Sequence, residues 1–229
     1  MKRIIQPEIL DRLPPDDPRA IRSRRDLRRI NGLMGNHHLM AEALQKAFPN
    51  NPVKRITEIG AGDGEFLFRV AQKIDPRWAN VQATLIDLQK NITEETLAAF
   101  AFLGWHAEAM VADVFDWPQM ECDVVVANLF LHHFDDLRLA ELLRMISCRT
   151  KLFIVIEPRR APWPLFCSHW LRAIGCNDVT CHDAAISVRA GFCGHELSAL
   201  WPEKQGWQLT ERRAGAFSHL FIAQKTSQP

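Results

Sequence analysis

Three glycines and two acidic residues stand close together in the segment Glu58-Ile59-Gly60-Ala61-Gly62-Asp63-Gly64. The segment directly follows an expected strand, Val53–Thr57, and precedes an expected helix that starts with Glu65 and Phe66. Glycine at such a strand-to-helix turn lets the backbone approach a ligand at the carboxyl end of the strand. The pattern therefore predicts a cofactor site.

The charges of this turn separate two classes of cofactor. The dinucleotide pattern GxGxxG would require a third glycine at position 65, where the chain has Glu65. Carboxylates at Glu58, Asp63 and Glu65 would also repel an anionic pyrophosphate, whereas they suit a ligand that carries a sulfonium and an ammonium group. The charge pattern favours S-adenosylmethionine, with a nicotinamide cofactor as the competing interpretation.

The segment EIGAGDG resembles motif I of class I S-adenosylmethionine-dependent methyltransferases. The layout of the chain is similar to that family over roughly residues 54–157 and in the final hairpin. The resemblance implies that the cofactor is bound by Glu58, Gly60, Ala61, Gly62 and Gly64.

The resemblance also implies cofactor contacts at the ends of the next two strands. Asp87 corresponds to the acidic residue that accepts both ribose hydroxyls, since a carboxylate can accept two hydrogen bonds from a vicinal diol. Leu88 is expected to cover one face of the adenine. Asp113 is expected beside the adenine amino group and Val114 against the ring, although Asp116 could take the role of Asp113.

Two histidines follow the strand at which the methyl group should emerge. The resemblance brings Asn128 and Leu129 to the methionine end of the cofactor, and the segment continues to His132 and His133. Methyl transfer to a hydroxyl requires removal of a proton, and histidine suits this task near neutral pH. We predict that His133 or His132 is the base, with His133 favoured. In related methyltransferases, however, similar LHH sequences often have a structural role. His182 is a further candidate for the acceptor site.

A bound metal is not expected. His37 and His38, like His132 and His133, are adjacent in sequence, so on a helix their rings would point about 100° apart. Neither pair has the i, i+4 spacing of helical metal ligands.

A capping box explains two residues beside His182 without any function. Thr180 and Asp183 have the spacing T-x-x-D, which predicts the start of a helix that Gly191 ends.

Short apolar runs alternate with helical patterns through the middle of the chain, which predicts a parallel sheet covered on both faces. Two further strand-like runs, Trp207–Arg212 and Phe217–Gln224, form a hairpin signal. The expected fold is α/β, a Rossmann-like seven-stranded, mostly parallel sheet with a C-terminal antiparallel hairpin. The five central strands are expected near 54–59, 82–87, 107–111, 122–127 and 151–156, and the helices between them near 64–74, 91–103 and 135–147.

We interpret residues 1–229 as one methyltransferase domain. Residues 1–50 would form a helical lid, 51–159 the cofactor-binding core, 160–202 a helical cap and 203–229 the hairpin. The lid helix should start at Asp17 and Pro18. Within the cap, one helix is expected to carry Trp163, Phe166, Trp170 and Leu171, and this apolar content favours a hydrophobic acceptor.

Composition excludes several other classes of protein. The formal net charge is +1, and the one basic cluster, at 22–29, falls short of the surface of a nucleic-acid-binding protein. This basic helix could rest on an anionic membrane, and Arg29 or Asn31 could contact the cofactor carboxylate. No apolar run is long enough to span a bilayer, so we expect a cytoplasmic protein with reduced thiols.

The predicted function is S-adenosylmethionine-dependent O-methylation of a small hydrophobic acceptor, phenolic or polyketide-derived. The segments RRDLRRINGLMGN and IGCNDVTCHDAAISVRAGF resemble small bacterial methyltransferases associated with polyketide or phenolic-lipid biosynthesis, which implies secondary metabolism. The alternatives are C-methylation of a quinone-like or lipid acceptor, methylation of RNA or protein, and a non-catalytic, cofactor-binding regulatory subunit. The sequence does not determine the acceptor or the oligomeric state.

Overall fold

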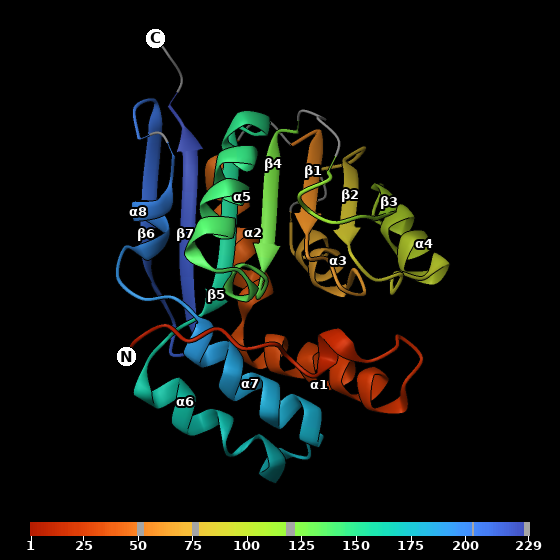
Figure 1. Cartoon of the computed structure of the whole chain (residues 1–229). Coiled ribbons are helices and arrows are strands. Elements are labelled where there is room, and N and C mark those ends of the chain that lie inside the picture. The colour runs from red at the N-terminus through yellow and green to blue at the C-terminus, as the bar shows by residue number, and fades with distance from the viewer. Residues whose placement is uncertain (50–52, 75–77, 118–121, 203, 227–229) are drawn as a thin grey trace.

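A seven-stranded sheet forms the centre of the molecule (Figure 1). The computed structural model describes residues 1–49, 53–74, 78–117, 122–202 and 204–226. The strand order is β3-β2-β1-β4-β5-β7-β6, with β1 to β5 parallel and β7 antiparallel to both of its neighbours. The predicted fold class is confirmed. The strands are β1 Arg55–Ile59, β2 Gln82–Asp87, β3 His106–Val111, β4 Val124–Asn128, β5 Leu152–Pro158, β6 Trp207–Ala214 and β7 Ser218–Lys225.

The central strands are apolar at successive positions because both faces of the sheet are covered. Every residue of β4 and β5 is buried. Val124 and Val126 pack into a core with α2, Asn36–Ala47, α3, Glu65–Ala71, and α4, Glu94–Phe102. Val125 and Ala127 point to the opposite face, where α5, Asp136–Arg149, and α8, Glu196–Leu200, complete a second core. Successive residues of β4 therefore pack into opposite cores.

The order of the strands reverses between β1 and β4. β1 pairs with β2 on one side and with β4 on the other, and β4 pairs in turn with β5. In open α/β sheets such a reversal leaves a crevice outside the carboxyl ends of the strands, where ligands bind. The glycine-rich turn after β1 and the segment after β4 both border this crevice.

A layer of helices lies beyond the carboxyl ends of the strands (Figure 1). It contains α1, Pro18–Met34, α6, Pro162–Ser168, the 3-10 helix η3, Leu171–Ile174, and α7, Asp178–Ala190. Of the helices that the structure describes, none has the length and apolar character needed to traverse a bilayer.

Helix α1 starts where the sequence predicts. The Asp17 carboxylate accepts a hydrogen bond from the Arg19 amide, Pro18 occupies the first turn, and Gly35 ends the helix with a φ of 71°. Its buried face is partly polar: the hydroxyls of Ser23 and Thr180 lie 2.9 Å apart. Hydrogen bonds as well as apolar contact therefore join the lid to the cap.

The predicted capping box in α7 is wrong. The N-cap is Asn177, whose Oδ1 accepts the Thr180 amide at 2.9 Å, so the helix begins at Asp178 and Thr180 lies inside its first turn. Asp183 instead accepts the amides of Ile9 and Leu10, each at 2.9 Å. The carboxylate that the sequence spacing assigned to the helix end therefore binds a distant segment of the chain instead.

The single aromatic helix expected in the cap is also wrong, since α6 ends at Ser168 and a separate turn carries Trp170 and Leu171. The Ser168 hydroxyl and the His169 Nδ1 contact the Leu165 carbonyl at 2.7 and 2.6 Å. These side chains satisfy a carbonyl at the helix end, which favours termination of the helix there.

Replacement of Glu211 by Gln should destabilise the fold. The buried Glu211 carboxylate accepts the Leu197 and Ser198 amides at 3.1 and 2.7 Å and pairs with His219 at 2.8 Å. Burial raises the pKa of Glu211, but hydrogen bonds from His219 and Ser198 outweigh burial and lower it. We expect Glu211→Gln to lower the free energy of unfolding at pH 7 by about 1–3 kcal/mol.

The stabilisation by a carboxylate of lowered pKa is present above its unfolded pKa of about 4.3 and is lost as pH falls through the folded value. The difference between wild type and Glu211→Gln should therefore shrink below about pH 4.3 in urea titrations. Glu141→Gln, at an exposed pair with Arg138, should change stability by less than about 0.5 kcal/mol. Equal effects of both variants would contradict the prediction.

Candidate active site

A cavity of about 420 Å³ lies at the carboxyl ends of β1, β2 and β4. Its walls come from the sheet, from α1 and from the N-terminal segment, so the lid closes over the crevice at the strand reversal. The predicted cofactor residues that line the cavity are Glu58, Gly60, Ala61, Gly62, Asp87, Leu88, Asn128 and Leu129.

Close packing explains the glycine pattern. Gly60 has a φ of 66°, and a Cβ there would lie 2.2 Å from Cδ2 of Phe130, so any side chain would collide with the segment after β4. Gly64 does not line the cavity; a Cβ there would lie 3.1 Å from Thr96 and 3.2 Å from Leu85. The absence of a side chain at Gly60 thus lets the turn after β1 lie against the segment after β4, and Gly64 lets α3 approach the sheet.

Asp87 is held rigidly at the end of β2. Its Oδ2 accepts the Gly62 amide at 2.8 Å, and its Oδ1 accepts the Gln89 amide at 2.9 Å. These bonds fix the carboxylate against the glycine turn and leave lone pairs for a ligand.

Negative charge concentrates beneath the cavity. Glu58 is 1% exposed, and its Oε2 has no hydrogen-bond partner within the described residues. Burial, followed by the charges of Asp63 and Asp87, raises the pKa of Glu58 well above its ordinary value. Arg28 offsets part of this charge at 3.2 Å from Asp63. An unpartnered buried carboxyl group beside two acids fits a cationic ligand.

The end of β4 is shaped by an unusual backbone. Leu129 has a φ of 54°, which is uncommon for a residue with a side chain, and its amide donates to the Ile156 carbonyl at 2.8 Å. Beside it, Asn128 donates to Asn31 at 3.2 Å and accepts from Asn36 at 2.9 Å. These amides tie the lid to the strand, and Asn31 also lines the cavity.

Three further predicted residues lie outside the cavity lining. The Asp113 carboxylate accepts the Phe115 amide at 2.9 Å in a turn, and Val114 is buried in the second core. His182 is about half exposed on α7 and contacts Asp183 at 2.9 Å. Their roles toward cofactor and acceptor stay predictions. Arg29 likewise does not line the cavity and lies 3.8 Å from Asp26.

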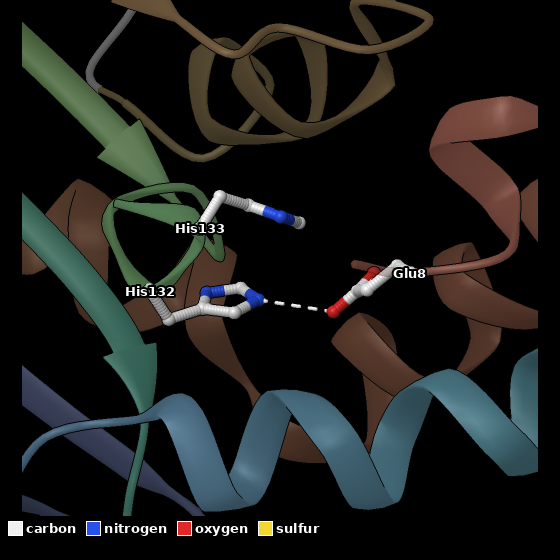
Figure 2. Close-up of side chains that lie close together, drawn as sticks. All are labelled: Glu8, His132 and His133. Carbon is white, nitrogen blue, oxygen red and sulfur yellow. Dashed lines mark hydrogen bonds and ion pairs between the residues drawn. The ribbon is translucent and has the colours of Figure 1, made fainter. Parts of the chain in front are cut away.

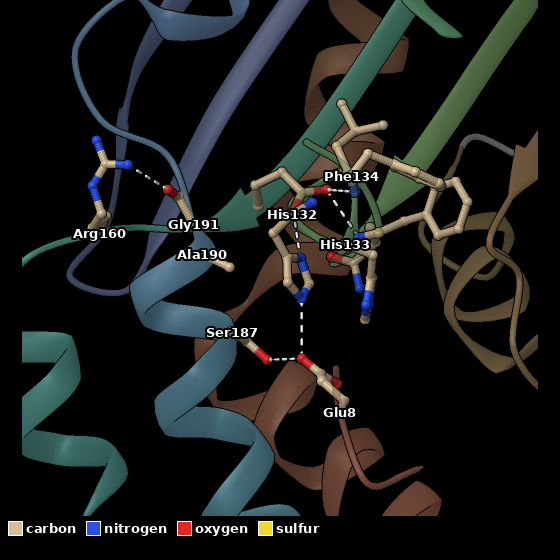
Figure 3. A network of polar contacts seen from close by, with 12 residues as sticks. Glu8, His132, His133, Phe134, Arg160, Ser187, Ala190 and Gly191 are labelled. Atoms are coloured by element: carbon tan, nitrogen blue, oxygen red, sulfur yellow. Dashed lines mark hydrogen bonds and ion pairs between the residues drawn. The ribbon is translucent and has the colours of Figure 1, made fainter. Parts of the chain in front are cut away.

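His132 belongs to a buried cluster of ionisable side chains, and His133 lies next to it (Figure 2). His132 is 3% exposed, and its Nδ1 lies 2.8 Å from Glu157 while its Nε2 lies 3.3 Å from Glu8. Glu157 also accepts the Leu131 amide at 2.7 Å, and the Ser187 hydroxyl donates to Glu8 (Figure 3). The cluster joins β5, the segment after β4, α7 and the N-terminal segment.

The two histidines have opposite ionisation. Burial lowers the pKa of His132, but hydrogen bonds to Glu157 and Glu8, with their charges, outweigh it and raise the pKa to about 9. Burial and then the charge of His132, whose ring lies 4.3 Å away, lower the pKa of His133 to about 4. At neutral pH, His132 is therefore an imidazolium and His133 a neutral imidazole. Asp11 approaches Nδ1 of His133 at 3.4 Å.

Sequence reasoning did not find Glu8, Asp11 or Glu157. Glu157 had a usable signal, because it directly follows the apolar run at 151–156 and so lies at the carboxyl end of a central strand. Glu8 had none, since it lies 124 positions from His132 in sequence. Only the fold brings them together.

Glu8, His132 and His133 each offer a possible metal ligand atom, and these atoms lie within 4.8 Å of one another. Both nitrogens of His132 already face carboxylates, and the imidazolium itself supplies the positive charge between them. The sequence-based expectation that no metal is bound stays a prediction.

Comparison with known proteins identifies a methyltransferase domain within the chain. Residues 56–151 match the family model described as "Methyltransferase domain". That region holds the glycine-rich turn, Asp87 and the histidine pair, on the sheet expected for class I. The chain carries a methyltransferase domain, and its activity is that of an S-adenosylmethionine-dependent methyltransferase. A comparison with curated proteins gave no match.

Solved structures share the fold of this methyltransferase. The plantazolicin methyltransferase BpumL in complex with S-adenosylhomocysteine has a TM-score of 0.65 and 14% identity, with 92% of each chain covered. The mitomycin 7-O-methyltransferase MmcR has a TM-score of 0.64 and 20% identity, covering 95% of this chain and 60% of that one. An O-methyltransferase family protein from Burkholderia thailandensis has a TM-score of 0.62 and 17% identity, covering 93% and 62%. This chain thus spans about three fifths of these two O-methyltransferases.

Replacement of Gly60 by Ala should weaken cofactor binding by this methyltransferase. The added Cβ would collide with Phe130, and the positive φ adds strain, so the turn must move away from its ligand position. We expect at least about a tenfold rise in the Kd for S-adenosylhomocysteine, equivalent to about 1.4 kcal/mol, by titration calorimetry.

Gly175→Ala is the matched control for that experiment. Gly175 also has a positive φ, of 87°, but a Cβ there would meet no atom within 4 Å, and Gly175 does not line the cavity. Its Kd should stay at the wild-type value. An unchanged Kd for a folded Gly60→Ala protein would contradict the close-approach argument.

Proposed function

We propose that this methyltransferase transfers a methyl group to a hydroxyl oxygen of a small hydrophobic acceptor, phenolic or polyketide-derived, with His133 as the base. The observation that carries the proposal is a neutral imidazole in the cavity wall, in the segment that follows β4, which ends at Asn128. As proposed from the sequence, the enzyme would serve secondary metabolism in the cytoplasm.

His133 suits proton removal better than His132. The imidazolium of His132 donates toward Glu157 and Glu8 from its two nitrogens, so it has no lone pair for another proton. His133 is neutral, a quarter of its side chain is exposed, and it lines the cavity. Its ring is positioned by the adjacent ring of His132, tilted by 34°, and by Asp11.

The proposed step is an in-line displacement. The acceptor oxygen forms a bond to the methyl carbon as the carbon–sulfur bond breaks, and the bonding pair stays on sulfur to give neutral S-adenosylhomocysteine. The hydroxyl proton passes to His133. The oxygen becomes strongly acidic as it gains a third bond, so a base of pKa about 4 is sufficient to accept its proton.

The residues around the cavity suggest how the cofactor is held. Asp87 would accept the ribose hydroxyls, and the carboxyl groups of Glu58 and Asp63 would balance the cationic methionine end. Asn128 and Leu129 would contact that end beside His133. On the sequence resemblance, Asp113 and Val114 would serve the adenine, although they do not line the cavity in this structure.

The preference for a small hydroxyl acceptor rests on the cavity and on related folds. Phe130, Leu129 and Pro158 give the cavity beside the histidines apolar surface. Two similar folds are described as O-methyltransferases, one of them acting on mitomycin. The cap aromatics Trp163 and Trp170, from which the sequence favoured a hydrophobic acceptor, do not line the cavity, so they no longer support that choice.

A transfer assay tests the function directly. Purified protein would be incubated with methyl-labelled S-adenosylmethionine and panels of phenols, resorcinols, quinones and fatty-acyl-derived acceptors. We expect labelled methyl ethers from hydroxylated aromatic acceptors. Label on ring carbon would instead identify a C-methyltransferase. Cofactor binding without transfer to any acceptor in the panels would favour a regulatory role.

Replacement of His133 by Ala should lower kcat by about 10²-fold or more, because the general base is removed. Cofactor affinity should persist, and imidazole in the buffer should restore part of the rate. Since the pKa of His133 is about 4, its proton is already absent at neutral pH. The fold-loss caused by the substitution should therefore be constant from about pH 5.5 to about pH 8.

His106→Ala is the matched control, since His106 is exposed at the amino end of β3, opposite the cavity, and its kinetics should equal wild type. EDTA should leave the wild-type rate unchanged. If EDTA abolished the rate and a divalent cation restored it, a metal ion would take the role that we assign to His133. Wild-type kcat in His133→Ala would remove His133 as the base.

A further inference from the structure

The outer surface of the cap carries an unusual run of exposed aromatic side chains. Trp163, Phe166 and Trp170 are 58%, 55% and 61% exposed. The ring centroid of Phe166 lies 5.9 Å from that of Trp163 and 6.1 Å from that of Trp170, so the three rings form one patch. Ile174, on the next turn, is 60% exposed. A contiguous apolar patch on a water-facing surface commonly marks an interaction site.

The patch belongs to no cavity of the catalytic site. Helix α6 buries Pro164 and Ser168 on its other side, and α6 packs against α7. None of the three aromatic residues lines the cavity that holds His133. Neither cofactor binding nor the proposed proton transfer explains their exposure.

A basic stripe lies beside the aromatic patch. Arg22, Arg25 and Arg29 are exposed on α1 at spacings of three and four residues, which places them along one side of the helix. Arg22 donates to the carbonyl of Gly175 at 3.3 Å, directly after η3, so one end of the stripe contacts the segment that follows the patch. The acid within the stripe, Asp26, is buried and accepts the Asn177 amide at 2.8 Å.

We propose that the aromatic patch of Trp163, Phe166 and Trp170 and the basic stripe of Arg22, Arg25 and Arg29 together bind an anionic lipid bilayer. Tryptophan and phenylalanine insert at the boundary between headgroups and acyl chains, and arginine extends to the lipid phosphates. Positive charge beside the aromatics matches a negatively charged surface and favours such a bilayer over an uncharged one. The contact is peripheral and independent of the proposed acceptor.

The chain contains a built-in reporter for this contact. Of its seven tryptophans, Trp78, Trp105, Trp117, Trp201 and Trp207 are no more than 9% exposed, whereas Trp163 and Trp170 lie in the patch. A blue shift of tryptophan fluorescence on addition of vesicles therefore reports on the patch. The full chain would be mixed with vesicles of phosphatidylcholine, with or without phosphatidylglycerol.

We expect flotation with the vesicles and a blue shift only when phosphatidylglycerol is present, and both should weaken as salt is raised. The double variant Trp163→Ser/Trp170→Ser should lose at least about tenfold in vesicle affinity. Arg22→Gln/Arg25→Gln should lose a similar factor, at roughly fivefold for each arginine. Arg22→Lys/Arg25→Lys should restore binding, and matched melting temperatures would show that the variants are folded.

Phe102→Ser is the control for an exposed aromatic residue elsewhere, since Phe102 is 92% exposed on α4. Its vesicle binding should equal wild type. Binding that ignores lipid charge, or survives both the tryptophan and arginine substitutions, would overturn the proposal. A wild-type dimer that Trp163→Ser/Trp170→Ser converts to monomers, without vesicle binding by either form, would assign the patch to a second copy of the chain.

Discussion

A buried imidazolium between two carboxylates holds the catalytic end of this methyltransferase together. His132 pairs with Glu157 at the end of β5 and with Glu8 from the N-terminal segment, so one side chain links the sheet to the lid. Burying three ionisable groups is costly unless each is paired and hydrogen-bonded. Amides after β4 and the Ser187 hydroxyl supply further partners for the two carboxylates. Burial, and then the charge that remains on His132, keeps the adjacent His133 neutral.

The cofactor end of the cavity follows the opposite electrostatic logic. There Glu58 has no hydrogen-bond partner in the described part of the chain, and burial, followed by the charges of neighbouring acids, raises its pKa. A site that leaves negative charge uncompensated favours a ligand that brings positive charge. S-Adenosylmethionine carries that charge, whereas S-adenosylhomocysteine has lost the sulfonium. The same acids would thus bind the substrate form of the cofactor more strongly than the product form.

Contacts between the lid and the cap include polar ones that water could replace. Ser23 faces Thr180, and Asp26 accepts the Asn177 amide at the start of α7. Separating such groups costs less than exposing a purely apolar interface, because water satisfies the released donors and acceptors. The N-terminal segment is held in the same way, through the bonds from Ile9 and Leu10 to Asp183. None of these contacts belongs to the two apolar cores, so α1 and the N-terminal segment are joined to the cap outside them.

The sequence by itself determined the sheet, its hairpin and the glycine-rich turn, because these depend on local periodicity and on the conformations that only glycine adopts easily. Asp87 and His133 could also be placed, since the ends of parallel strands converge on one edge. Tertiary structure alone decided which distant side chains contact that edge of the sheet. The contacts of Glu8 and Asp183, and the exposure of Trp163 and Trp170, depend on which distant segments pack together. A pattern within a few residues carries no information about contacts made across more than a hundred positions of chain.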